Sequence, residues 1–304
     1  MSPENQRGVR QRRCFPDLLG IAFVLAAAGL LMAPALAHGR LLGPYDQLSQ
    51  FGLTSKLHIK IQNDQISDLI REIIPWTTLS WTQVHAGFLP LWNPYGILGA
   101  PLAFNWQSAT FSIPALVGYL APVRFDFTLQ VLLSLVIGGS GVYVLGRILR
   151  LGILGAAMGA TVFELNGAFM ALLGWPIAAT MSWAGWLFGC AILVVRGNHR
   201  RRSTVQFAIV LALAIYAGQP DTLVLLAISL AVFLVVLLGF RAGRMGWSDG
   251  TLRPGLDLGI GAVAGLGLAA PLAFPAAQLS SGSVRAAGRH NAYPIHDVLH
   301  VIFQ

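Results

Sequence analysis

Charged side chains are scarce in this 304-residue chain, where they make up 11% of the residues, against roughly a quarter in an ordinary soluble domain. Hydrophobic residues make up 55%, and the mean hydropathy is +0.66. The apolar residues lie in blocks of about 20, the length that an α-helix needs to cross a hydrocarbon layer about 30 Å thick. This composition excludes an ordinary soluble core and predicts an all-α fold, a polytopic bundle of transmembrane helices.

Cysteine is also rare, with Cys14 beside the first apolar block and Cys190 inside a later one. Two cysteines placed in this way indicate neither a disulfide framework nor a cysteine-based metal site. The sequence also lacks internal repeats and low-complexity tracts.

Acidic residues are few as well, with 12 Asp and Glu against 20 Lys and Arg and a net charge of +8. A basic chain can bind nucleic acid, but here the basic residues cluster in short segments between apolar blocks. Anionic lipid headgroups and the polarity of membrane insertion explain that pattern. We therefore expect membrane lipid as a partner, and no nucleic acid.

Seven spans are predicted, at residues 18–37, 126–147, 152–172, 175–195, 204–218, 221–240 and 257–277. With the N-terminus in the cytoplasm, 13 of the 20 Lys and Arg residues face that side, as the positive-inside rule requires of a multi-pass protein of the plasma membrane. These are Arg7, Arg10, Arg12, Arg13, Arg147, Arg150, Arg196, Arg200, Arg201, Arg202, Arg241, Arg244 and Arg253. Ala35-Leu36-Ala37 resembles a signal-peptidase site, so a cleaved signal peptide is the alternative for the first block.

The domain organisation follows from these spans. A cytoplasmic N-terminus (1–17) and the first transmembrane helix (18–37) precede an extracytoplasmic loop (38–125) with an interfacial helix and a re-entrant segment at Phe111–Pro122. The transmembrane bundle covers 126–277, and 278–304 is a second extracytoplasmic segment. We expect the chain to be the front portion of a longer protein.

The loop contains a predicted helix, Asp64 to Trp81, whose apolar stripe could lie on the membrane surface. Its opposite face carries Asp64, Asp68 and Glu72 at positions i, i+4 and i+8. Neighbouring carboxylates in this arrangement could share a divalent cation, Mg²⁺ or Mn²⁺, or raise each other's proton affinity as a general base requires. The alternative is a solvated helix face with Arg71 as a local counter-charge.

A segment rich in proline, glycine and aromatic residues follows that helix. It offers flat apolar faces beside hydrogen-bonding groups, the kind of surface that holds a sugar, although an aromatic belt at the headgroup level explains it equally well. The candidate substrate-binding residues are Trp92, Asn93, Asn105, Trp106 and Gln107.

Polar groups in or next to the later spans are functional candidates, because ionisable groups are costly inside a membrane. They share one depth on the outer side, which predicts a polar cavity that opens outward; each of them could instead be a hydrogen-bond partner between helices. These candidates are Glu164, Gln219, Asp221, Arg285 and Arg289. His296 and His300 lie four residues apart but lack the Glu of the zinc-hydrolase helix, so we predict no metal site there.

The loop residues also carry a family resemblance. The matching positions are Asp68, Pro75-Trp76, Gly87, Pro90-Leu91-Trp92-Asn93-Pro94, Gly99, Pro101-Leu102, Gln107 and Pro114, followed by Gly174, Pro176, Gly218 to Asp221, Pro275, Ser283 and Arg285. This pattern resembles YfhO-type bacterial membrane proteins, which are relatives of the GT-C glycosyltransferases. It extends over roughly 60 to 290, and the Pro-Leu-Trp-Asn-Pro block is its most specific part.

The resemblance implies a GT-C-like enzyme that transfers a sugar from a polyprenyl-phosphate donor to a cell-envelope acceptor on the outer face. In that family an acidic residue of the first outer loop acts as general base or metal ligand; Asp68 occupies the matching place, with Asp64 in reserve. We infer that Arg285 or Arg289 neutralises the departing phosphate. Trp175 and Gln219 stand where relatives often have histidine, and the family's later spans are missing. A transporter, or a lipid-binding or structural membrane protein without catalysis, is the competing prediction.

Overall fold

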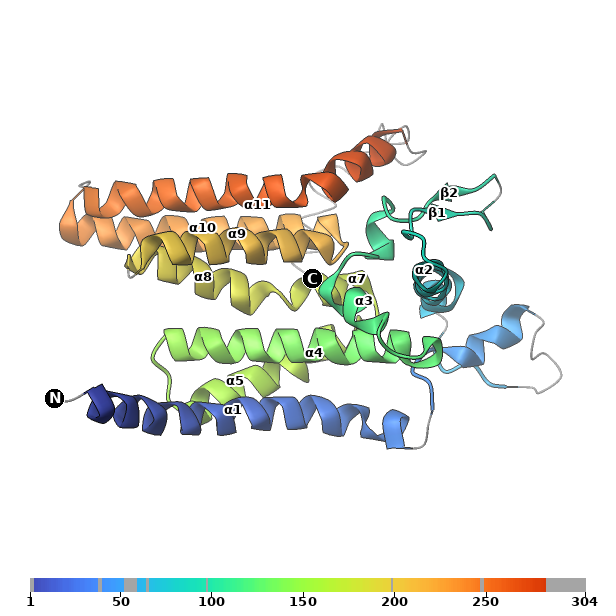
Figure 1. Cartoon of the computed structure of the whole chain (residues 1–304), viewed down its shortest axis with the longest axis horizontal. Coiled ribbons are helices and arrows are strands. Elements are labelled where there is room, and N and C mark those ends of the chain that lie inside the picture. Colours follow the sequence, from blue (N-terminus) through green and yellow to red (C-terminus); the bar gives the residue numbers. More distant parts are fainter. Residues whose placement is uncertain are drawn as a thin grey trace, which may run out of the picture.

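The computed structural model describes residues 3–37, 40–51, 59–63, 66–96, 98–197, 199–246 and 249–282, and most of them are helical (Figure 1). The long helices run side by side along the longest axis of the molecule, each reversing the direction of the one before it. They are α1 (Pro3–Ala37), α4 (Val123–Ile148), α5 (Ile153–Glu164) with α6 (Gly167–Ala171), α7 (Pro176–Met181) with α8 (Ala184–Arg196), α9 (Arg200–Tyr216), α10 (Pro220–Met245) and α11 (Asp249–Ser281).

Six stretches in the described part of the chain are long and apolar enough to cross a membrane: 17–34, 123–148, 153–171, 176–196, 220–244 and 251–281. They confirm the prediction of a polytopic helical membrane protein. The remaining predicted span, 204–218, coincides with α9, which has 17 residues and packs chiefly against α11 and α8. The count of seven spans stays a prediction.

Proline and short polar side chains set where several helices begin. Proline stands in the first turn of α7 and α10, where its missing N–H costs no helical hydrogen bond. The predicted span 152–172 is divided because Asn166 caps a new helix, its side chain accepting a hydrogen bond from the Phe169 N–H at 2.9 Å. Figure 1 shows α11 bending toward its C-terminal end, where Pro271 and Pro275 interrupt the helical hydrogen bonding.

The two ends of the bundle differ in charge and in structure. One end, here called the basic end, holds the N-terminus and the α4–α5, α8–α9 and α10–α11 connections, so the 13 arginines assigned to the cytoplasm gather there (Figure 1). The opposite end, here called the loop end, carries the long connection between α1 and α4. This segregation agrees with the predicted orientation, which is argued from the positive-inside rule.

The long connection folds into short elements over the loop end. These are η1 (Tyr45–Phe51), the π-helical turn η4 (Leu69–Ile73), α2 (Ile74–His85), the paired strands β1 (Trp92–Asn93) and β2 (Ala100–Pro101), η5 (Trp106–Ser108) and α3 (Ile113–Gly118). With six residues, α3 is too short to span, as predicted for Phe111–Pro122.

The predicted apolar stripe of the loop helix packs in part on α4, and its position relative to the membrane surface stays a prediction. Leu69 and Ile73 are 5% and 8% exposed and share a hydrophobic cluster with Phe127 and Val131 of α4. The loop end of α4 therefore provides the apolar surface that buries Leu69 and Ile73, and this contact attaches the loop to the bundle.

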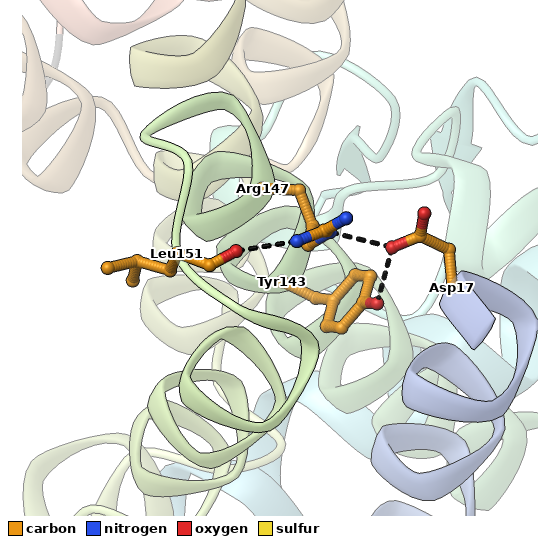
Figure 2. Close-up of polar contacts among 4 residues, drawn as sticks. All are labelled: Asp17, Tyr143, Arg147 and Leu151. Atoms are coloured by element: carbon orange, nitrogen blue, oxygen red, sulfur yellow. Dashed lines mark hydrogen bonds and ion pairs between the residues drawn. The ribbon is translucent and has the colours of Figure 1, made fainter. Parts of the chain in front are cut away.

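A hydrogen-bonded cluster joins α1 to α4 at the basic end (Figure 2). The Arg147 Nε donates to Asp17 Oδ1 at 2.6 Å, and its Nη1 donates to the Leu151 carbonyl at 2.6 Å. The Tyr143 hydroxyl donates to the same Asp17 oxygen at 2.9 Å. Because Gly20 has no side chain, the Tyr143 ring lies directly against α1; a Cβ at Gly20 would overlap that ring.

Replacing Gly20 by leucine should therefore push α1 away from α4. We expect Gly20→Leu to lower the free energy of unfolding by about 1–3 kcal/mol, the usual cost of overpacking, measured as a lower Tm in detergent micelles. Gly29→Leu is the matched control, since a Cβ at Gly29 has no heavy atom within 4 Å. An equal loss of stability in both variants would contradict this packing of α1.

Candidate functional site

A polar cavity lies at the loop end, between the loop residues 107–114 and helices α2, α4 and α7. Hydroxyl and amide side chains make up much of its wall, together with the aromatic ring of Trp175. The free volume is about 40 Å³, room for a few water molecules and less than a sugar ring occupies. This loop-end pocket is lined by Ile73, Thr77, Gln107, Ser108, Ala109, Ser112, Pro114, Phe127, Gln130, Val131, Ser134, Gly174, Trp175, Pro176 and Ala179.

One face of α4 supplies a polar row to this region. Asp126, Gln130 and Ser134 follow each other at i, i+4 and i+8, so their side chains lie one above the other on the helix. The Gln130 Nε2 donates to Asp126 Oδ1 at 2.8 Å, and the Ser134 hydroxyl donates to the Gln130 carbonyl at 3.0 Å. Gln130 and Ser134 line the pocket, and Asp126 stands directly behind Gln130.

Asp126 is a buried carboxylate, 1% exposed, in the first turn of α4. It fits beneath α3 because Gly118 has no side chain; a Cβ there would overlap the Asp126 Oδ1. The other carboxylate oxygen, Oδ2, makes no hydrogen bond with the residues that the structure describes. A buried acceptor without a partner is costly, so this oxygen has the geometry to receive a water molecule or a ligand hydroxyl.

Two more buried polar side chains lie near α3. The Thr110 hydroxyl makes no hydrogen bond within the described part of the chain, and the buried Ser80 hydroxyl lies next to the Tyr119 phenol. Between them lies Tyr119, whose hydroxyl donates to the Thr110 carbonyl at 2.8 Å. Burial raises the pKa of Tyr119 above its usual range, so its phenol stays a neutral hydrogen-bond donor. These residues and Asp126 are buried polar groups around α3, and none of them lines the pocket.

The turn at η5 closes the pocket by contacting two distant parts of the chain. The Asn105 side chain caps η5 by accepting from the Gln107 N–H at 3.3 Å. The Gln107 Nε2 then donates to Gln219 Oε1 at 3.4 Å, and the Trp106 Nε1 donates to the Ser280 hydroxyl at 3.2 Å. The pocket wall therefore depends on contacts with the α9–α10 turn and with the end of α11.

Gly218 makes the close approach of this turn possible. Its φ of +94° is a backbone conformation that residues with a side chain rarely adopt, and a Cβ would overlap the carbonyl oxygen of Trp106. Glycine is therefore required here by both the turn and the contact.

The structure brings some predicted site residues together. Asn105, Trp106 and Gln107 lie in one turn, and Gln219 contacts it from the start of α10. Trp92 and Asn93 belong instead to the β1–β2 hairpin, where the Trp92 side chain is 50% exposed and lies over Gly99. Neither hairpin residue lines the loop-end pocket.

The predicted carboxylates do not gather at the pocket. Asp68, Arg71 and Glu72 lie on an exposed face, as the solvated-face alternative predicts, and Asp221 is exposed in the first turn of α10. Asp64, Arg285 and Arg289 lie outside the described residues, as do His296 and His300. In the described part of the chain no three His, Cys, Asp or Glu residues approach closely enough to hold a metal, so the predicted use of Mg²⁺ or Mn²⁺ stays a prediction.

Glu164 was predicted to line a cavity shared with Gln219, but it lies inside the bundle and away from the loop-end pocket. The side chain is fully buried, and neither carboxylate oxygen makes a hydrogen bond among the described residues. It packs against Gly139 of α4 and Val24 of α1, neither of which lines the loop-end pocket. Glu164 is therefore separate from Gln107 and Gln219.

Asp126 is the acidic residue that sequence reasoning missed. The sequence contains two indications of its importance. An ionisable residue in a span is a functional candidate by default, and Asp126, Gln130 and Ser134 recur at helical spacing. The predicted span began at Asp126 itself, so the carboxylate was interpreted as a residue at the membrane boundary. Asp126 becomes buried because α3, which is part of the loop, packs over the start of α4.

Fold and site together define a polytopic α-helical membrane protein with a polar pocket at one end of its bundle. Comparison with models of protein families, with curated proteins and with solved structures gives no match for this chain.

The contact between Gly218 and the η5 turn can be tested by adding one methyl group. We expect Gly218→Ala to cost about 1–3 kcal/mol through backbone strain and to speed amide hydrogen exchange over residues 105–109, measured by mass spectrometry. Gly239→Ala on α10 is the control; a Cβ there meets open space, and alanine favours the helix. Unchanged exchange in Gly218→Ala would contradict the described contact.

Proposed function

We propose that this chain is a membrane-embedded, GT-C-like glycosyltransferase of the YfhO type. It transfers a sugar from a polyprenyl-phosphate donor to a cell-envelope acceptor at the loop end, which faces the outside. The observation that carries the proposal is the loop-end pocket with a buried carboxylate, Asp126, behind it.

The chemistry of the pocket suits a sugar. Hydroxyl and amide groups of Gln107, Ser112 and Gln130 match the hydroxyls of a hexose, and Trp175 offers a flat face for its apolar side. Because about 40 Å³ does not admit a sugar ring, binding requires the η5 turn to move away from α4. Such a movement breaks the side-chain hydrogen bonds of Trp106 and Gln107 and separates Trp106 from Gly218 and from the apolar cluster of α9 and α11.

In this proposal Asp126 is the general base. Its Oδ2 accepts the proton of the acceptor hydroxyl, the acceptor oxygen forms a bond to C1 of the sugar, and the bond between C1 and the phosphate oxygen breaks. The polyprenyl phosphate leaves with the electron pair of that bond. Gln130 fixes the carboxylate by donating to Oδ1, which leaves Oδ2 for the acceptor.

The two positions where relatives often have histidine, Trp175 and Gln219, both lie at the loop-end pocket. Trp175 lines the pocket, and Gln219 is bonded to Gln107 in its wall. Histidine at these positions would bring titratable groups, whereas tryptophan and glutamine offer a stacking face and neutral hydrogen bonds. We infer that this chain binds a donor or acceptor different from those of relatives with the two histidines.

A transporter is the second candidate, and the interrupted helices beside the pocket favour it. The turn between α7 and α8, at Ser182 and Trp183, divides one span, and α7 begins in the pocket wall at Pro176. Discontinuous helices of this kind form substrate sites in secondary transporters. Both functions use the same pocket and differ in whether a covalent product forms.

The Asp126→Asn variant separates these functions. In membranes with the full-length gene product, we expect it to slow consumption of a polyprenyl-phosphate-linked sugar about 10²–10⁴-fold, the usual worth of a general base. Asparagine keeps the shape of the side chain, so membrane insertion and Tm should stay as in the wild type. Asp221→Asn, an exposed carboxylate at the same end, should react at the wild-type rate.

Asp68→Asn tests the carboxylate that the family resemblance favours. Loss of transfer in Asp68→Asn with wild-type activity in Asp126→Asn would move the active site to η4 and overturn the role of Asp126. Substrate counterflow in proteoliposomes without any covalent product would instead support the transporter.

A further inference from the structure

A second cavity lies at the basic end, between the ends of α4 and α8 and the last turns of α10. Its free volume of about 440 Å³ is far larger than that of the loop-end pocket. The residues that line this basic-end groove are Leu149, Ile192, Val195, Arg196, Phe233, Leu237, Phe240, Arg241 and Arg244.

Three arginines line the groove, and among the described residues no carboxylate does. The Arg196 Nη1 donates to the Ile148 carbonyl at 2.5 Å, and the Arg241 Nη1 donates to the Val195 carbonyl at 3.0 Å. These bonds hold the two guanidinium groups at the helix ends, and a guanidinium carries five N–H donors. Arg244 is exposed in the last turn of α10. The groove therefore presents concentrated positive charge to an anion.

The rest of the groove wall is apolar. Phe233, Leu237 and Phe240 of α10 face Ile192 and Val195 of α8 across the groove. Only 6% of the span of α10 is buried within the protein, and most of its side chains that pack against the core of α8 and α9 stay partly exposed. In a bilayer, the space between such helices is filled by lipid chains, because water cannot satisfy an apolar wall at that depth.

We propose that the basic-end groove binds one anionic glycerophospholipid, with its phosphate on Arg196, Arg241 and Arg244 and an acyl chain along Phe233 and Leu237. Charge complementarity selects the anionic headgroup, and the apolar wall selects an amphiphile over a free phosphate ion. Basic pockets between transmembrane helices on the cytoplasmic side recognise lipids by this combination. The lipid then adds to the direct contacts between α10 and α8, which include the Arg241–Val195 hydrogen bond and the packing of Phe233 on Phe188.

Native mass spectrometry of the full chain in detergent tests this directly, with phosphatidylglycerol and phosphatidylcholine as the two probes. We expect the wild type to retain phosphatidylglycerol selectively. Removing two arginines, in Arg196→Gln with Arg244→Gln, should weaken its binding about 30-fold. The matched control is Arg201→Gln with Arg202→Gln, which removes the same charge from the same end, outside the groove, and should bind as the wild type does.

A thermal unfolding series supplies a second measurement. Phosphatidylglycerol should raise the Tm of the wild type and of the control pair, and should not raise that of the groove pair. Inorganic phosphate alone should change none of them. The proposal is overturned if both double variants lose binding equally, if phosphatidylcholine binds as tightly as phosphatidylglycerol, or if free phosphate reproduces the stabilisation.

Discussion

Hydrocarbon offers no hydrogen bonds, so a chain that crosses a bilayer must pair or segregate its polar groups, and this constraint organises the whole molecule. Arginines gather at the helix ends, where Asp17 binds Arg147 and Asp257 binds Arg200. Two buried carboxylates depart from that order among the described residues: Glu164, neither of whose oxygens is hydrogen-bonded, and Asp126, which lies beneath α3 with one such oxygen. The burial of Asp126 costs free energy that a ligand or ordered water would recover.

The two ends of the bundle arrange their polar groups differently: the loop end encloses them, whereas the basic end exposes them at a groove. At the loop end, the η5 turn and α3 cover α4 and enclose hydroxyl and amide groups, with Asp126 bonded to Gln130 behind them. At the basic end, the groove between α8 and α10 stays open along an apolar wall and is also lined by arginines. The two cavities lie at opposite ends of the bundle and share no lining residue, so the two proposals can be tested separately.

Much of the fold was predictable, because membrane spans are encoded locally in length and hydropathy. The blocks at 126–147 and 221–240 correspond to α4 and α10 with ends that differ by a few residues. The breaks at Asn166 and at Ser182 were not predicted, because a long apolar window averages over one capping residue. The apolar stripe of the loop helix was recognised, but its packing on α4 was not, because an amphipathic pattern does not say whether lipid or protein covers it.

The site was less predictable than the fold. Trp106 contacts Ser280 and Gln107 contacts Gln219 across more than a hundred residues, and no local pattern specifies such pairs. The family resemblance directed attention to Asp68, which is exposed, whereas Asp126 acquires its environment only when Gly118 and Tyr119 fold over it. Residue type and spacing identified the polar end of the molecule but not which acid it encloses.

The central claim, that the η5 turn closes a substrate pocket on the outer face, is tested most directly by thiol labelling of Gln107→Cys in intact cells. Cys14 and Cys190 are replaced by serine, and Arg201→Cys reports on the opposite end. The account predicts that a membrane-impermeant maleimide labels Gln107→Cys from outside, that a polyprenyl-phosphate-linked sugar protects it, and that Arg201→Cys reacts only after permeabilisation. Labelling of Gln107→Cys only after permeabilisation, or labelling that the donor leaves unchanged, would contradict it.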